Sequence, residues 1–520
     1  MRALACALSV LVLAPPAALA QECRAATAQP ADGYIVAGSQ TYAYDASGQR
    51  RQLLDLFVQP DAGVHPTVLV IHGGGWTTGS REAHIGQFLE LVTEAGYNWV
   101  AIDYRLDGSR EDAAADVRAA LAFLACQARA LRLDMAKLVA LGEDVGADLA
   151  AQMASESRVA AAALVGGVYR ESLPLTRAPV RVVHGGDDRE APVAAARQYC
   201  DRLQRQENAL AGGCEFDLVE GAIHRAENWR PSQWGYKARF VQWLRRVVGP
   251  GAARSVRFDP QPVRDVLGPG LHKRLTYNSQ TGQTLDAWIP GGAGPHIPVL
   301  LVHGGGWEAG DRVTYITPMF RPLASAGLAW FSMDYRLTPE VSHPAQLQDL
   351  RDAIRFLRER AGSFNIDTRR LVIVGESASG QMVAQIGTED SALLGVVSFY
   401  GVYDFEPMAS NLSARSAVTR LFGVTELDET SRATLRTFSP IHHVHSKQPP
   451  MLLIHGTNEV LWAQGQAMAE RLKAVGARYE LLALDGAPHG MENWEGSSSP
   501  WGHYKAHVVG WITALAAALR

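Results

Sequence analysis

The chain contains one long pattern twice, and this duplication restricts its fold more than any other feature. The repeated segments keep the same order in both halves: HGGGW at 72–76 and 303–307, DYRL at 103–106 and 334–337, and a histidine followed after two residues by Glu-Asn-Trp at His224 and His489. A match in order over such a length indicates two copies of one domain and not a chance pair of motifs.

Within each copy, short apolar runs alternate with helical segments. Runs such as 299–302 and 371–374 are apolar throughout, as is typical of strands that are covered on both faces. This alternation predicts an α/β fold in which each copy has a mostly parallel, doubly wound sheet flanked by helices. Glycines and prolines interrupt the pattern between 248 and 263, so we place the domains at 34–248 and 263–520 and expect them to contact each other.

The first twenty residues have the pattern of an export signal. Arg2 precedes an apolar stretch at 4–13, and the small-residue sequence ALA at 18–20 forms a cleavage site before Gln21. That stretch is too short to cross a bilayer, and no later one is long and apolar enough. We therefore expect an exported protein, periplasmic or secreted, that is cleaved near Ala20 and has no membrane anchor. The formal net charge of −4 gives no electrostatic basis for binding nucleic acid.

After this leader the chain keeps four cysteines, all in the first half: Cys23, Cys126, Cys200 and Cys214. An even number of cysteines in an exported protein predicts two disulfides, for which three pairings exist. We expect Cys200 to pair with Cys214, since that bond would join a helix end to the following strand, and this leaves Cys23 for Cys126. Buried free thiols are the alternative.

The second half carries the groups that acyl transfer needs. The sequence GESASG at 375–380 follows an apolar strand and places Ser377 on a tight strand-to-helix turn, where a serine acts as a nucleophile. The backbone amides of Ala378, at the start of the helix, and of Gly305 and Gly306 are the expected donors to the developing oxyanion. Ser379 stands where a glycine is usual.

A base and an acid are expected further along the chain, with the histidine last. His489 lies in a loop after the apolar run 481–484 and matches His224, so we interpret it as the general base. Glu459 follows another apolar strand, at the position that Asp188 has in the first half, and is expected to orient His489. Asp404, just after the preceding strand, is the rival acid.

In this order, the motifs resemble the carboxylesterase and hormone-sensitive-lipase branch of the α/β-hydrolase superfamily, which includes bacterial feruloyl- and acetyl-xylan-type esterases. The resemblance covers nearly all of both halves after the leader. It implies two tandem α/β-hydrolase domains and hydrolysis of a small-molecule or carbohydrate-linked ester through an acyl-Ser377 intermediate, with no cofactor or metal and a preference for small acyl groups. Glu459 for the commoner aspartate and Ser379 for glycine depart from the family's pattern and bear on rate more than on reaction type.

The second half also has an insertion, roughly Asp404 to Lys447, that the first half lacks. In this fold an insertion at that place covers the active site, so we expect a cap on the second domain alone. Three tryptophans are candidates for pocket walls or for the core: Trp307, Trp462 and Trp494. Three histidines without a carboxylate pattern are interpreted as loop residues and not as metal ligands: His442, His443 and His445.

The first copy keeps His224 and Asp188 but has Asp144 where the second copy has Ser377. Because a histidine cannot activate a carboxylate as it activates a serine, we interpret this domain as catalytically inactive, with a role in binding carbohydrate or in supporting the second domain. Hydrolases of this fold that cleave halides or epoxides do use an aspartate nucleophile, which makes Asp144, His224 and Asp188 an alternative catalytic set. The missing insertion argues against it, because those enzymes have an apolar cap.

The leading hypothesis is an exported serine carboxylesterase that hydrolyses short-chain or aryl and acetyl esters. A peptidase or amidase of the same fold would use the same residues, although the N-terminal propeller that is usual in prolyl peptidases is absent. A secreted binding protein with two silent sites is the alternative from another class, and the intact motif around Ser377 argues against it.

Overall fold

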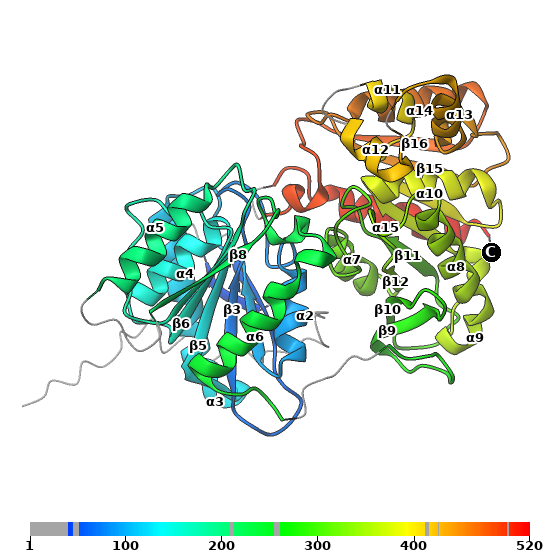
Figure 1. Cartoon of the computed structure of the whole chain (residues 1–520). Helices are drawn as coiled ribbons and strands as arrows, with labels where there is room; N and C mark the ends of the chain where they lie inside the picture. Colours follow the sequence, from blue (N-terminus) through cyan, green and yellow to red (C-terminus); the bar gives the residue numbers. More distant parts are fainter. Residues whose placement is uncertain are drawn as a thin grey trace, which may run out of the picture.

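The computed structural model describes residues 40–44, 51–206, 213–253, 260–410, 415–424, 426–496 and 499–519, so the leader and Cys23 lie outside the described residues. The chain forms two α/β domains that lie side by side (Figure 1). Each domain is built on one eight-stranded sheet, and the strand order is the same in both when it is read from the corresponding edge: β1-β2-β4-β3-β5-β6-β7-β8 and β9-β10-β12-β11-β13-β14-β15-β16.

The elements of the first domain come in the alternating order that the sequence predicts. Its strands are β1 (Gln40–Tyr44), β2 (Arg51–Phe57), β3 (His65–Ile71), β4 (Asn98–Ile102), β5 (Leu133–Glu143), β6 (Ala161–Val165), β7 (Val180–Gly185) and β8 (Cys214–Val219). Its helices are α2 (Gly86–Glu94), α3 (Arg110–Leu131), α4 (Val145–Ser155), α5 (Val193–Gln204) and α6 (Gly235–Val248), with the short η1 (Ala226–Asn228) and η2 (Pro231–Gln233).

The second domain repeats this order and adds helices. Its strands are β9 (Gly270–Asn278), β10 (Gln283–Ile289), β11 (Pro298–Val302), β12 (Ala329–Met333), β13 (Val372–Glu376), β14 (Gly395–Phe399), β15 (Met451–Gly456) and β16 (Tyr479–Leu484). Its helices are α7 (Phe320–Ser325), α8 (Ala345–Glu359), α9 (Ala361–Phe364), α10 (Ala378–Glu389), α11 (Phe405–Ser410), α12 (Arg415–Phe422), α13 (Glu429–Thr437), α14 (Trp462–Ala474) and α15 (His503–Ala517), with η3 (Thr317–Met319), η4 (Thr368–Arg370), η5 (Pro440–His442) and η6 (Met491–Trp494).

Both sheets are parallel except at one edge, which confirms the predicted fold class. Strand β2 runs antiparallel to β1 and β4, β10 runs antiparallel to β9 and β12, and the remaining pairs are parallel. The central strands β11 and β14 are buried along their whole length because their apolar side chains meet helices on both faces. Since the carboxyl ends of parallel strands meet at one edge, the loops that follow them gather at that edge and form the site.

The connection between β14 and β15 contains the insertion, which folds into α11, α12 and α13. In the first domain the corresponding connection between β6 and β7, residues 166–179, contains no helix. The second domain therefore has a helical cap that the first lacks.

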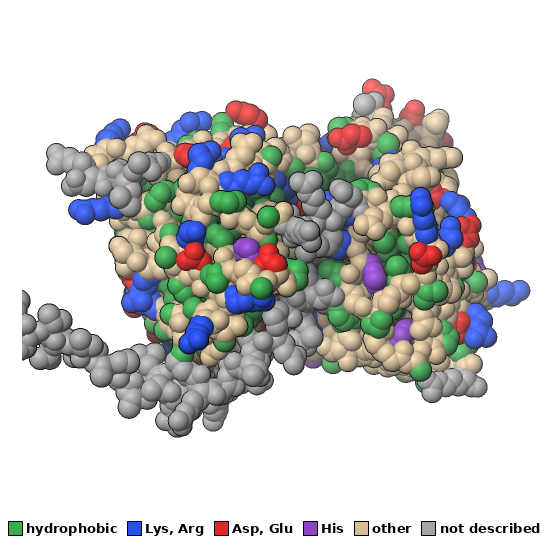
Figure 2. All heavy atoms as spheres, turned by 90° about the horizontal axis from the view of Figure 1, so that it is seen from below, with side chains coloured by type: hydrophobic (Ala, Val, Ile, Leu, Met, Phe, Trp, Pro, Cys, Tyr) green, Lys and Arg blue, Asp and Glu red, His purple; other side chains and the backbone are tan. Residues whose placement is uncertain are grey.

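A disulfide joins Cys200 near the end of α5 to Cys214 at the start of β8, as the sequence predicts. Cys126 is disulfide-bonded as well, and its expected partner Cys23 lies outside the described residues. None of the helices in the described ranges is long and apolar enough to cross a membrane. On the face shown in Figure 2, acidic and basic side chains are interspersed.

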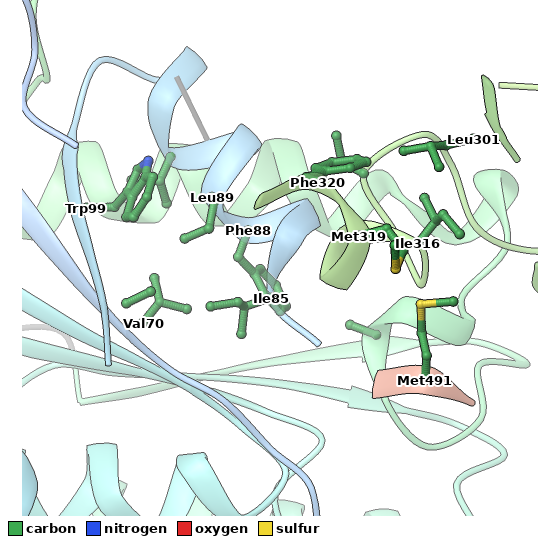
Figure 3. Packing of buried hydrophobic residues seen from close by; sticks show 14 of the residues in the cluster. Val70, Ile85, Phe88, Leu89, Trp99, Leu301, Ile316, Met319, Phe320 and Met491 are labelled. Atoms are coloured by element: carbon green, nitrogen blue, oxygen red, sulfur yellow. The ribbon is translucent and has the colours of Figure 1, made fainter. Parts of the chain in front are cut away.

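The two domains share one apolar core across their contact. Side chains of α2 and the segment before it, among them Ile85 and Phe88, belong to the same buried cluster as Ile316, Met319 and Phe320 of the second domain (Figure 3). These segments are counterparts, since α2 lies between β3 and β4 and the segment with η3 and α7 lies between β11 and β12. The contact is close at Gly86, where an added Cβ would lie 2.1 Å from the carbonyl oxygen of Val313. At this point the backbones of the two domains leave no space for a side chain at position 86.

Buried ion pairs cross the same contact. Glu90 of α2 pairs with Lys273 and Arg312 of the second domain, and the side chains of Glu90, Lys273 and Arg312 are 9%, 0% and 7% exposed. Burial favours the neutral form of Glu90, but the guanidinium of Arg312 and the ammonium of Lys273 outweigh it and hold the pKa of this carboxyl well below its usual range. Removing one partner of a buried pair leaves an uncompensated charge, which is costly.

We predict that Glu90→Ala lowers the free energy of unfolding by about 3 kcal/mol, because Lys273 and Arg312 then lose a carboxylate partner in a place that water does not reach. Denaturant unfolding followed by tryptophan fluorescence measures this. Glu111→Ala is the matched control, since the Glu111 side chain is 69% exposed and its pair with Arg118 lies at the surface, where such pairs contribute about 0–1 kcal/mol. Equal midpoints for the two variants would contradict a stabilising role for the ion pairs between the domains.

Candidate active site

Ser377 lies on the sharp turn between β13 and α10, with φ +54° and ψ −114°. This is a strained conformation for a residue other than glycine, and such strain gathers at functional sites. Small neighbours permit the turn, since a Cβ on Gly375 would lie 2.4 Å from the carbonyl oxygen of Ser379. The hydroxyl of Ser379 accepts from the amide of Glu376 and donates to the carbonyl of Val302. Ser379, which stands where a glycine is usual, therefore stabilises the turn through these two hydrogen bonds.

The structure brings Ser377, His489 and Glu459 together from three loops. Nε2 of His489 lies 3.0 Å from the Ser377 hydroxyl, and Nδ1 lies 2.5 Å from the Glu459 carboxylate. Because an ionised carboxylate only accepts hydrogen bonds, Nδ1 carries the proton and Nε2 is left to accept from the serine. This arrangement can remove the proton from Ser377 when the hydroxyl attacks a carbonyl.

Two histidines hydrogen-bond to the carboxylate of Glu459. Its side chain is fully buried, and its second carboxylate oxygen accepts from Nδ1 of His455 at 2.8 Å. Burial would raise the pKa of Glu459, but the hydrogen bonds from His455 and His489 outweigh it and hold the pKa below its usual value. The rival acid, Asp404, caps the start of α11 by accepting from the amide of Glu406, and its nearest recorded basic group is His442 at 3.9 Å. Of the two candidate acids, Glu459 is the one that contacts His489.

In the first domain, a side chain of the protein itself occupies the position of an oxyanion. One carboxylate oxygen of Asp144 accepts from the amides of Gly74 and Gly75 at 3.0 and 2.9 Å. The counterparts of these glycines are Gly305 and Gly306, which have φ values of +92° and +62°. Since Asp144, with φ +50°, occupies the same turn as Ser377, the amides of Gly305 and Gly306 are the groups that would face an oxygen bound beside Ser377.

A cavity of about 530 Å³ opens beside Ser377 and His489. Gly306 and Ala378 line it next to the nucleophile, and the remaining walls come mostly from the cap and α14. Apolar side chains provide most of these walls: Trp307, Val402, Pro407, Met408, Val460 and Leu461. The cavity therefore suits a small apolar group bonded to the carbonyl that Ser377 attacks.

The tryptophans and the insertion histidines singled out in the sequence differ in where they lie. Trp307 lines the cavity, Trp494 is fully buried against Tyr400, and Trp462 is not among the lining residues. In the insertion, His442 lies near Asp404 and Glu406, close enough for a metal site, but Glu406 is already paired with Arg432 and Arg436. The two other histidines of the insertion lie against backbone carbonyls: His443 and His445.

In the first domain, His224 is held between two carboxylates. Its Nδ1 lies 2.8 Å from Asp188 and its Nε2 lies 3.6 Å from Asp144. Burial lowers the pKa of His224, but the hydrogen bonds with Asp144 and Asp188 outweigh this and raise the pKa to about 10. Asp144 and His224 are also largely buried, at 4% and 7% exposure. The imidazole is therefore positively charged at neutral pH and shielded from solvent.

Two residues near the site escaped the sequence analysis. His455 supports Glu459, and a signal for it exists, because the same His-x-x-x-acid spacing recurs as His184 and Asp188 in the first half. The ring of Tyr400 packs 4.6 Å from that of His489, and its hydroxyl accepts from the amide of Met491. No motif marks Tyr400, since the aligned position of the first half is a glycine.

A Ser–His–Glu arrangement on the loops at the carboxyl edge of a mostly parallel sheet is that of a serine hydrolase with the α/β-hydrolase fold. The chain belongs to the BD-FAE family, whose sequence pattern matches residues 54–165 and 285–472, more than half of the chain. One matched stretch lies in each domain, which agrees with the duplication.

Several of the relatives are esterases. Esterase LipC of Mycobacterium tuberculosis (strain ATCC 25618 / H37Rv) is 28% identical over 293 residues, which cover 51% of this chain and 72% of LipC. Ethyl acetate hydrolase of Pseudomonas putida is 27% identical, covering 37% of this chain and 64% of the enzyme. The match to esterase LipQ of M. tuberculosis spans 56% of that relative, so the chain covers only part of several relatives. Family and relatives together place the chain among the ester hydrolases.

Solved structures of similar proteins each match about half of the chain. A truncated carbohydrate esterase from gut microbiota is 22% identical with a TM-score of 0.41, covering 46% of this chain and 94% of that structure. An esterase from Pyrobaculum calidifontis is also 22% identical with a TM-score of 0.41, covering 45% and 81%.

Proposed function

We propose that the second domain hydrolyses carboxylic esters through an acyl-Ser377 intermediate. The observation that carries this proposal is the continuous hydrogen-bonded chain from Ser377 through His489 to the buried carboxylate of Glu459. His489 takes the proton of Ser377 while its oxygen attacks the ester carbonyl, and the amides of Gly305, Gly306 and Ala378 receive the oxyanion. His489 then gives this proton to the leaving alcohol oxygen as the C–O bond breaks.

Water completes the cycle by the same route. His489 takes a proton from a water molecule, the hydroxide attacks the acyl carbonyl, and Ser377 leaves with the proton that His489 returns. Glu459 stabilises the imidazolium that forms in both halves of the reaction. The apolar cavity supports short-chain, aryl or acetyl esters as substrates, in keeping with the name of the relative from P. putida.

For the first domain we propose a role without catalysis. Asp144 fills its own oxyanion hole, so a substrate carbonyl would have to displace a buried carboxylate. Two carboxylates keep His224 protonated, which argues against the alternative in which Asp144 is the nucleophile, because that chemistry needs a neutral histidine to activate water. The set of Asp144, His224 and Asp188 is better explained as a buried structural ion cluster.

We also propose that the protein is exported. The disulfide between Cys200 and Cys214 supports this, since such bonds persist in oxidising compartments. The leader that would direct export lies outside the described residues.

Covalent labelling tests the catalytic proposal. Diethyl p-nitrophenyl phosphate should transfer one diethylphosphoryl group to Ser377 and release one equivalent of p-nitrophenolate, because the triad activates this serine alone. Intact mass and peptide mapping detect the adduct, and the Ser377→Ala protein is the unlabelled control. A label in the first domain, or none in a protein that hydrolyses p-nitrophenyl acetate, would refute the proposal.

A further inference from the structure

Two cavities meet at the nucleophile. The apolar cavity and a second one of about 670 Å³ share only Gly306, Ser377 and His489 among their lining residues. An ester has an acyl part and an alcohol part on the two sides of the attacked carbonyl, so two cavities that meet at Ser377 can each hold one part. Residues of both domains line the second cavity, which we call the interdomain cleft.

The cleft lies on the side of the base. His489 lines both cavities, but Gly490 and Glu492 of the same loop line only the cleft, whereas the apolar cavity extends under the cap. His489 has to donate a proton to the oxygen of the departing alcohol, so the leaving group must lie next to it. The larger share of this loop in the cleft wall favours the cleft as the place for the alcohol part of the ester.

The first domain builds one wall of the cleft. Arg189 comes from the loop between β7 and α5, and the other lining residues come from the loop between β8 and α6: Gly221, Ile223, Asn228, Arg230 and Gln233. This loop is the counterpart of the loop that carries His489 in the second domain. Contacts fix it in place, since the Tyr315 hydroxyl hydrogen-bonds with the Glu227 carbonyl and the Asn228 side chain at 2.9 and 2.8 Å. Arg230 also pairs with Glu308 across the cleft at 2.8 Å.

The cleft wall has more arginines than carboxylates that pair with them. Arg189, Arg230 and Arg420 line the cleft, and the single carboxylate of Glu308 serves both Arg230 and Arg420. Arg189 is exposed and has no ion pair or hydrogen bond within the described part of the chain.

Two further glutamates in the lining do not reverse this balance. Burial raises the pKa of Glu376 to about 8 and also raises the pKa of Glu492. Both side chains are buried, at 2% and 9% exposure. Among the lining residues that are not buried, three carry a guanidinium group and one, Glu308, carries a carboxylate, so a negatively charged group in the cleft would be attracted.

We propose that the first domain supplies the leaving-group subsite of the second, and that the substrate is an ester whose alcohol part is polar and negatively charged, bound by Arg189 and Arg230. This inference rests on the proposed function, because it assigns a substrate class to the same Ser377 centre. It also gives a reason why a domain without a nucleophile is kept beside the catalytic one.

The test compares two acetates with leaving groups of the same shape, 4-acetoxybenzoate and its neutral amide, 4-acetoxybenzamide. The ratio of kcat/KM for 4-acetoxybenzoate to that for 4-acetoxybenzamide reports the response to the charge of the leaving group, because the acetyl group is the same in both. Arg189→Glu should lower this ratio about tenfold and Arg230→Gln about threefold relative to the unaltered protein, and added salt should shrink the difference. Arg369→Ala is the control, since its side chain is 87% exposed and lies outside the cleft; it should keep the ratio of the unaltered protein.

An unchanged ratio in Arg189→Glu and Arg230→Gln, with both acetates still hydrolysed by Ser377, would overturn the subsite and leave the proposed function standing. Absence of hydrolysis of either acetate, together with no phosphoryl label on Ser377, would overturn the proposed function and the subsite with it.

Discussion

Replacing Ser377 with alanine is expected to lower kcat/KM for p-nitrophenyl acetate by at least about 10³-fold, because the triad acts as a unit and fails when its nucleophile is lost. The variant should fold normally. Ser377 makes few side-chain contacts other than that with His489, and alanine fits the space that the hydroxyl leaves. Rates at several acyl lengths, with thermal unfolding as the check on folding, measure the effect.

Asp144→Ala is the matched control for this experiment. Asp144 occupies the same turn as Ser377, with φ +50° against +54°, and also lies near a histidine of its own domain. Since this variant loses a buried partner of His224, thermal unfolding checks that it is folded, and we expect the folded variant to keep the ester hydrolysis of the unaltered protein. If hydrolysis instead survived in Ser377→Ala and disappeared in Asp144→Ala, the aspartate of the first domain would be the nucleophile and our assignment of the domains would be reversed.

The duplication explains why much of the fold and the triad could be predicted. Two aligned copies show which positions matter: the apolar run before HGGGW gives β3 and β11, and the His-x-x-Glu-Asn-Trp motif marks the loop of His489. The match of Glu459 to Asp188 likewise pointed to the carboxylate that contacts His489 in the structure. These features depend on local pattern and chain order, which sequence records directly.

The sequence could not predict the features that depend on contacts between segments far apart in the chain. The carboxylate of Asp144 accepts hydrogen bonds from the amides of Gly74 and Gly75, and this contact depends on the side-chain conformation and on the position of the loop. The approach of Gly86 to Val313 joins segments more than two hundred residues apart, and Arg230 of the first domain pairs with Glu308 of the second. No local motif encodes either fact, so the cleft became visible only in the folded chain.

Glu459→Gln is expected to lower kcat for p-nitrophenyl acetate by about 10³-fold with little change in KM, since glutamine keeps the shape of the side chain but loses its charge. The carboxylate of Glu459 accepts from both His489 and His455. An amide group turned toward His489 can donate to Nδ1, which moves the proton to Nε2 and removes the acceptor that Ser377 needs. It also offers no negative charge to the imidazolium that forms when the proton is taken.

Asp404→Asn is the control that separates the two candidate acids. Asp404 lines the apolar cavity but interacts with Glu406 and His442, and no contact with His489 is recorded for it among the described residues. This variant should change kcat by less than about threefold, since it removes a charge from the cavity wall and leaves the triad intact. A large loss in Asp404→Asn beside a mild one in Glu459→Gln would make Asp404 the triad acid, and Glu459 would then serve only to hold His455 in the fold.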